Sequence, residues 1–167
     1  MKSLQQEEIH KFKAIVESIK TGILFTRSGI DKLKGRPMTT IRVDNNGDLW
    51  FFTNEFSGNV YEICKNNEVF INYANPFINT YAVVTGKAYL TREINKINEL
   101  YAPVIKTWFP AGLNDPNLLL LRIEPDEVKY WNGNSGRIVT SFKILSGMSS
   151  DDEFINGKII KADLNYL

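Results

Sequence analysis

The 167-residue chain is poor in the residues that build disulfides and metal sites. It has one cysteine, Cys64, and one histidine, His10. A lone cysteine cannot form an intramolecular disulfide, which suits a reducing compartment. No group of His, Cys, Asp and Glu has metal-ligand spacing, and a Ser-His-Asp triad would depend on His10. We therefore predict no metal site and expect His10 to lie on the surface.

The chain also lacks an excess of positive or negative charge, and it has no long apolar run. The chain has 20 Lys and Arg against 19 Asp and Glu, with an isoelectric point near 7.8. Domains that bind nucleic acid usually have values above about 9 and cluster their basic residues. The leucine run from Leu118 to Leu121 is too short to cross a bilayer, and residues 1–8 carry acids where a signal peptide would be apolar. We expect a cytoplasmic protein that binds neither nucleic acid nor membranes.

Apolar residues at helical spacing predict three helices. The first would span residues 4–20, the second residues 94–108 with a kink at Pro103, and the third part of the C-terminal region 132–167. The stripes that support them are Ile9, Phe12, Val16 and Ile19; Ile94, Ile97, Tyr101, Val104 and Trp108; and Ile138, Phe142 and Leu145.

Short β-type runs fill the chain between these helices. Asn45-Asn46-Gly47 favours a hairpin turn, because Asn and Gly tolerate positive φ. Gly86 lies inside a long run, where a missing side chain often marks a bulge. The runs are 23–26, 38–43, 49–53, 69–73, 81–90, 118–123 and 128–131. This pattern predicts one mainly β domain over residues 1–167, with flanking helices and a six- to seven-stranded antiparallel barrel at about 21–131; an open α+β sheet is the alternative.

Three segments carry candidate binding chemistry. In 35–40, Arg36 is a fixed cation suited to a phosphate or carboxylate, and Thr39 and Thr40 offer hydroxyls on opposite strand faces. In 50–59, a strand runs into a polar loop and a short helix whose N-terminus can bind an anion, although Ser57 would serve equally as a plain cap. In 129–137, Trp131 beside a Gly-rich turn suits a flat ring, and a buried core tryptophan is the simpler interpretation.

Taken together and in order along the chain, these segments resemble the general stress protein branch of the pyridoxamine phosphate oxidase-like, flavin-binding split barrels. The resemblance covers roughly Ser18 to Trp131. Its marks are Arg36-Pro37-Met38, Leu49-Trp50-Phe51-Phe52-Thr53, Thr85-Gly86-Lys87-Ala88, Lys106-Thr107-Trp108-Phe109-Pro110, Asp115-Pro116 and Tyr130-Trp131.

The resemblance implies a split-barrel homodimer with FMN at the subunit interface, FAD being the alternative cofactor. Arg36 would reach the flavin phosphate, and Trp131 would come from the partner subunit. The cofactor-binding residues carried over are Arg36, Pro37, Met38, Thr39, Thr40, Phe52, Thr53, Ser57, Asn59, Trp108 and Trp131. We expect a flavin-dependent oxidoreductase of unidentified substrate, with no catalytic side chain assigned. A flavin-binding stress protein without turnover, or a barrel that has lost flavin and binds another ligand, are the alternatives.

Two departures from the family pattern bear on function. Relatives commonly place basic residues, which bind the flavin phosphate, where Gly58-Asn59 stands here. The true oxidase has a histidine and a second arginine where Val139 and Ser141 stand. The first departure predicts weaker FMN binding, and the second argues against pyridoxamine phosphate oxidase activity.

Overall fold

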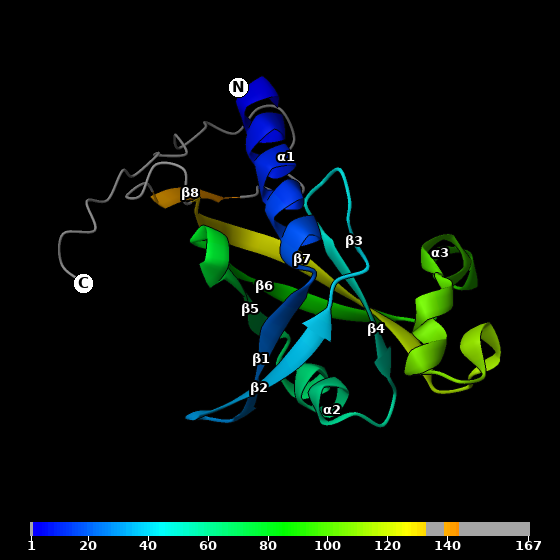
Figure 1. Ribbon diagram of the computed structural model, residues 1–167. Coiled ribbons are helices and arrows are strands. Elements are labelled where there is room, and N and C mark those ends of the chain that lie inside the picture. The colour runs from blue at the N-terminus through cyan, green and yellow to red at the C-terminus, as the bar shows by residue number, and fades with distance from the viewer. Residues whose placement is uncertain (1, 133–138, 144–167) are drawn as a thin grey trace.

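A computed structural model describes residues 2–132 and 139–143 of the chain (Figure 1). The helices are α1 Lys2–Ile19, α2 Gly58–Lys65 and α3 Ile94–Leu100, with short 3-10 helices η1 Pro76–Ile78, η2 Pro103–Thr107 and η3 Gly112–Asn114. The strands are β1 Thr21–Gly29, β2 Lys32–Thr39, β3 Arg42–Val43, β4 Leu49–Asn54, β5 Glu68–Asn75, β6 Thr80–Thr91, β7 Leu118–Trp131 and β8 Val139–Lys143. None of these helices is both long and apolar enough to span a bilayer.

The strands form one antiparallel sheet in the order β2-β1-β5-β6-β7-β4-β3, with β8 beside β7. β2 also contacts β4, although the two strands lie toward opposite ends of this order, so the sheet curls round on itself. The predicted mainly β, antiparallel fold with flanking helices is confirmed.

The barrel interior is filled by alternate residues of each strand. Leu24, Phe51, Ile71 and Leu121 have no exposed surface, as expected where every second side chain of a strand points inward. Helix α1 lies across one end of the barrel in Figure 1, and its apolar stripe, including Phe12, joins the same core. Burial of these side chains is the main force that holds α1 against the sheet.

A second apolar cluster lies on the outer face of β4 and β7. Trp50 and Leu120 point away from the barrel core and are covered by Ile97 and Leu100 of α3 and Ile105 of η2. Figure 1 shows α3 beside β4, apart from the other helices. The sheet is therefore buried on both faces in this region.

Pro103 breaks the second predicted helix instead of kinking it. Helix α3 ends at Leu100, the backbone is extended at Tyr101 and Ala102, and Pro103 begins the 3-10 helix η2. Proline lacks the N–H that an α-helix needs at an interior position, but it is well tolerated in a first helical turn.

The C-terminal helix predicted from Ile138, Phe142 and Leu145 is wrong for residues 139–143. These residues form β8, in which Phe142 pairs with Val128 of β7. The segment is rich in β-branched and aromatic residues, and the open edge of β7 gives it backbone hydrogen bonds. Residues 133–138 and 144–167, which include the rest of that prediction, lie outside the described part of the chain.

Two local features agree with the sequence. Gly47 adopts a positive φ of 91° in the turn between β3 and β4, as the hairpin prediction requires. A bulge occurs in the β6–β7 ladder at Gly86, where Asp126 of β7 has no partner and a Cβ would overlap the carbonyl oxygen of Glu124. Only glycine fits so close an approach of two backbones.

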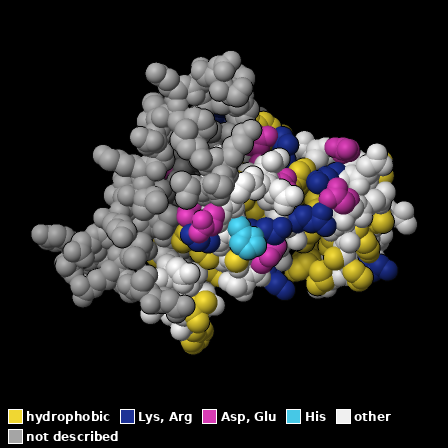
Figure 2. All heavy atoms as spheres, turned by 90° about the horizontal axis from the view of Figure 1, so that it is seen from above, with side chains coloured by type: hydrophobic (Ala, Val, Ile, Leu, Met, Phe, Trp, Pro, Cys, Tyr) yellow, Lys and Arg dark blue, Asp and Glu magenta, His cyan; other side chains and the backbone are white. Residues whose placement is uncertain are grey.

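Charged side chains of both signs lie interspersed on the described surface seen in Figure 2. His10 is exposed, as predicted, and Cys64 is an exposed free thiol on α2. No group of three metal-ligating side chains occurs within 2–132 and 139–143.

Candidate functional site: a pocket between β2, β4 and η2

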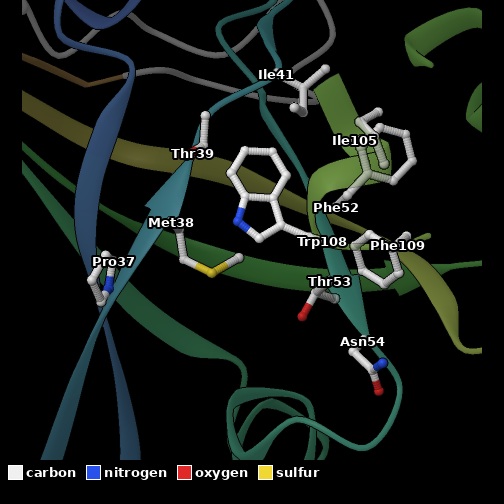
Figure 3. Close-up of a pocket in the computed structure, with 10 residues that line it drawn as sticks. All are labelled: Pro37, Met38, Thr39, Ile41, Phe52, Thr53, Asn54, Ile105, Trp108 and Phe109. Carbon is white, nitrogen blue, oxygen red and sulfur yellow. The ribbon is translucent and has the colours of Figure 1, made fainter. Parts of the chain in front are cut away.

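A cavity of about 210 Å³ opens where β2, β4 and the η2 region meet (Figure 3). Figure 3 shows the indole of Trp108 between Met38 and Thr39 on one side and Phe52 on the other. The lining residues are Pro37, Met38, Thr39, Ile41, Phe52, Thr53, Asn54, Ile105, Trp108 and Phe109. This wall is largely apolar and aromatic, with two hydroxyls and one amide, and it contains no titratable side chain.

Local sequence explains why these elements present this wall. Pro37 lies on β2, which in the described sheet pairs only with β1, and proline is tolerated on such an edge strand. β4 alternates, with Phe51 in the barrel and Phe52 against the outer cluster. The break at Pro103 turns the chain so that η2 brings Ile105 and Trp108 back over β4.

The first turn of α2 forms a polar boundary beside the pocket. Asn59 is only 2% exposed, and its Oδ1 accepts hydrogen bonds from the Ser57 hydroxyl and from the backbone N–H of Val60 at 3.0 Å. Its Nδ2 donates to Sδ of Met38 at 3.8 Å. Asn59 therefore uses its amide within the protein and ties α2 to β2, without itself lining the cavity.

Arg36 lies against the same turn and is paired with a carboxylate. Its Nη1 donates to Oε2 of Glu62 at 2.7 Å and to the Thr26 hydroxyl at 3.0 Å, and its Nη2 donates to Oε1 of Glu62 at 3.2 Å. The Glu62 side chain is 5% exposed. Hydrogen bonds from Arg36, against the opposing effect of burial, lower the pKa of Glu62 to about 2.

Gly58 leaves room for that arrangement. A Cβ at Gly58 would lie 2.9 Å from Nη2 of Arg36, closer than real side-chain contacts allow. The guanidinium thus occupies the space that a side chain at position 58 would fill.

Thr40 and Trp131 lie apart from the pocket within one chain. The Thr40 hydroxyl is 2.6 Å from the hydroxyl of Tyr73, a core residue whose pKa is raised by burial. Trp131 pairs with Tyr81 at the far end of β7. Roughly 35 Å of strand, at ~3.3 Å per residue, separate it from Leu120, the partner of Phe52.

The structure thus sorts the residues predicted from sequence into three groups. Pro37, Met38, Thr39, Phe52, Thr53 and Trp108 line one cavity; Arg36, Ser57 and Asn59 surround the start of α2 next to it; Thr40 and Trp131 lie elsewhere. Ile41, Asn54, Ile105 and Phe109 line the cavity without having been predicted. Phe109 follows Trp108 in one of the motifs that carry the family resemblance, so the sequence contained a signal for it. Glu62, the partner of Arg36, was not predicted either, and its only sequence signal is that it is an acid one helical turn after Gly58.

The sequence from residue 7 to residue 153 matches the model of the pyridoxamine 5'-phosphate oxidase-like family. The chain belongs to this family. It is also related to general stress proteins: 56 residues are 32% identical to General stress protein 26 of Bacillus subtilis, covering 34% of this chain and 39% of that protein. Protein bli-3 of Neurospora crassa is 25% identical over 134 residues, covering 74% of this chain and 64% of bli-3. The matched stretches thus span less than two thirds of both curated relatives.

Solved structures share the fold of this family member. A protein related to general stress protein 26, from Clostridium acetobutylicum, has a TM-score of 0.71 at 18% identity, covering 83% of this chain and 96% of that one. General Stress Protein 26 from Bacillus anthracis has a TM-score of 0.66 at 24% identity, with coverage of 74% and 92%. A general stress FMN/FAD binding protein from Xanthomonas citri has a TM-score of 0.65 at 23% identity, with coverage of 94% and 100%.

Proposed function

We propose that this chain binds FMN in the pocket between β2, β4 and η2 and serves as a flavin-dependent oxidoreductase. The observation that carries the proposal is the wall of the pocket. It presents apolar and aromatic surfaces to a flat ring, together with the hydroxyls of Thr39 and Thr53 and the amide of Asn54. Ligand pockets are typically apolar with a few placed polar groups. The FMN/FAD binding protein with the same fold supports the choice of a flavin, and FAD is the alternative.

The residues present fit a flavin in chemical character. Met38, Phe52 and Trp108 would pack on the ring, and Arg36 with the first turn of α2 would face its phosphate. A bound flavin would supply the redox chemistry through its own ring. The protein's part would be to orient that ring and exclude water from it.

A second copy of the chain would complete the site. The cavity of about 210 Å³ is smaller than the roughly 300–1,000 Å³ of typical small-molecule sites. Pro37, which lines it, pairs with Ile23 on a sheet face that no described element covers. We propose that two copies pack through this face and that each adds a wall to the other's pocket.

The composition of that face supports a homodimer. Ile23 is 39% exposed, Phe25 stacks on Phe70, and Val83 is half-buried beside them. Apolar side chains gathered on an open sheet face are typical of a surface that associates with another chain.

Trp131 gains a role in this arrangement. Its side chain lies on the same outer face as Tyr81 and Ile23, because residues that alternate with the core positions share one side of the sheet. We propose that it reaches the flavin of the partner subunit, since it cannot reach the pocket of its own chain.

A flavin-binding protein without turnover is the second candidate. It is favoured by the lining itself, in which no residue can act as an acid or base near neutral pH. Steady oxidation of NADH or NADPH by the FMN-loaded protein would support the oxidoreductase and exclude this alternative.

With Val139 and Ser141 in place of two substrate-binding residues, pyridoxamine phosphate is not the substrate that we propose. A lone thiol keeps a reducing, cytoplasmic location the expected one.

Titration of the purified protein with FMN tests the proposal. We expect quenching of flavin fluorescence at micromolar flavin and an FMN-dependent rise in melting temperature, because a ligand that binds only the folded state stabilises it. Neither effect at 100 micromolar FMN, a concentration on the order of 100 times a micromolar Kd, would refute flavin binding.

A further inference from the structure

The cation nearest the pocket has a fixed anionic partner. Glu62 binds Arg36 through both carboxylate oxygens, and it also accepts a hydrogen bond from Thr26 at 2.5 Å and an ion pair from Lys34 at 3.2 Å. Its carboxylate is buried and stays ionised at neutral pH, because its pKa is lowered to about 2. Any ligand anion that approaches Arg36 therefore also approaches a fixed negative charge.

We propose that Glu62 is a specificity-determining residue which weakens the preference of this site for a phosphorylated flavin. The pocket would then bind riboflavin nearly as tightly as FMN. This inference rests on the proposed function, since it concerns which flavin occupies the same pocket.

The first argument concerns the donors of Arg36. A guanidinium has five N–H groups, and phosphate is recognised best by two parallel ones. Glu62 already takes one N–H from each terminal nitrogen in a bidentate pair, and Thr26 takes another. The free donors are Nε–H and the second N–H of Nη2 on the other edge of the guanidinium, so a phosphate can bind Arg36 only on that edge, while the end-on edge of the same cation is already paired with Glu62.

The second argument concerns the neighbouring groups. Gly58 and Asn59 carry no charge, and the polar atoms of Asn59 are engaged by Ser57, Val60 and Met38. Lys34 faces the same Glu62, and Lys65 lies over the ring of Tyr61 at 4.2 Å. Around the start of α2, the described charges that could face a phosphate are thus Arg36 and Lys34 against Glu62.

The third argument is electrostatic. A phosphate carries up to two negative charges, so it is attracted by Arg36 and Lys34 and repelled by Glu62, which lowers the net charge of this group from +2 to +1. The ribityl end of riboflavin is neutral and experiences neither effect. The binding energy common to both flavins would come from the ring, held by the apolar wall of the pocket.

The test is the ratio of the riboflavin Kd to the FMN Kd, measured by fluorescence titration at one ionic strength. We expect a ratio below about ten in the unaltered protein. Glu62→Gln keeps the size of the side chain and removes its charge, so it should raise the ratio about tenfold, or about 1.4 kcal/mol, by tightening FMN alone. Glu68→Gln is the matched control, because Glu68 is an exposed acid paired with Arg27 at 3.8 Å, and the ratio should not change.

A second measurement does not depend on whether the variant folds. In the unaltered protein, FMN affinity should fall only modestly between low and high salt, because Arg36, Lys34 and Glu62 together carry a net charge of only +1. A ratio above one hundred, a steep salt dependence, or a fall in FMN affinity on Glu62→Gln with riboflavin unchanged would each overturn the inference and leave the proposed function standing. If neither flavin binds the unaltered protein, the proposed function itself fails.

Discussion

The outer surface of the sheet has two apolar regions, one covered by other elements of the chain and one left open. Over β4 and β7 it is sealed by α3 and η2, so that Leu120 has no exposed surface. Over β1, β5 and β6 no described element covers it, and Ile23 remains 39% exposed. In both regions the outward side chains alternate along the strands with side chains of the same barrel core. The strand pattern therefore does not explain why one region is covered and the other is open.

The comparison indicates that the two regions serve different purposes. The covered region stabilises the folded chain, because its apolar area is removed from water within one molecule. The open region leaves apolar area available for association. The pocket lies between them, with Pro37 adjoining the open region and Ile105 belonging to the covered one.

The largest effect should come from removing a side chain in the covered region. Leu120→Ala should lower the free energy of unfolding by about 2–5 kcal/mol, because it leaves a cavity in a sealed cluster. Ile23→Ala in the open region should cost less than about 1 kcal/mol at concentrations where the chain is monomeric. Urea unfolding of both variants measures the contrast, and equal losses would contradict it.

A charge in the open region should separate the subunits. Ile23→Asp places a carboxylate in the proposed interface, and we expect it to weaken dimerisation by about a hundredfold, or about 2.7 kcal/mol. Light scattering after size exclusion should show a monomer, and FMN affinity should fall with it. A variant that stays dimeric, or a monomer with full FMN affinity, would show that this face does not complete the site.

At the boundary, truncating the exposed ring of the pocket should weaken flavin binding. Trp108→Ala should raise the FMN Kd about tenfold, or about 1.4 kcal/mol, with little change in melting temperature. Val104→Ala is a matched control, since Val104 is also 55% exposed and lies in η2 outside the pocket lining. If the two variants bind FMN equally well, the ring does not pack on Trp108.

The smallest effect is a difference in pH dependence between Asp48, beside the covered region, and Glu62, beside the pocket. Burial and Asp44 raise the pKa of Asp48, beside the covered region, to about 6, so ionisation of Asp48 destabilises the fold as pH rises from about 4 to above 6. Glu62 has the opposite sign: its stabilisation is complete above about pH 4.5 and is lost as pH falls toward 2. Asp48→Asn should therefore add about 1 kcal/mol at pH 8 and almost nothing at pH 4, measured by urea unfolding. An equal gain at both pH values would contradict this assignment.

Local features of the fold could be predicted from sequence, whereas pairings between distant residues could not. The turn at Gly47 and the bulge at Gly86 follow from backbone chemistry within a few residues. The pairing of Arg36 with Glu62 depends on how β2 packs against α2, which the periodicity of neither element reveals. In the same way, the Thr40 hydroxyl was expected in the site and is instead held by Tyr73, 33 residues away.

The residues of the pocket could be predicted from short motifs, not from local backbone chemistry. Met38, Phe52 and Trp108 lie in the short motifs on which the family resemblance rests, and their spacing in the sequence alone does not predict that they line one cavity. Residues 139–143 were misjudged because three apolar residues at helical spacing are weak evidence beside an open strand edge.

The bulge at Gly86 has a consequence for how β7 tolerates change. The unpaired Asp126 shifts the strand by one position, so that Leu118 and Leu120 face outward while Val128 and Tyr130 face the barrel core. Loss of Asp126 itself would close the bulge and leave regular alternation, with Val128 and Tyr130 still facing the core, whereas loss of a paired residue such as Lys129 would turn Tyr130 to the other face. A single in-frame codon deletion would therefore be tolerated best at the bulge and would be harmful in the regular ladder on either side of it.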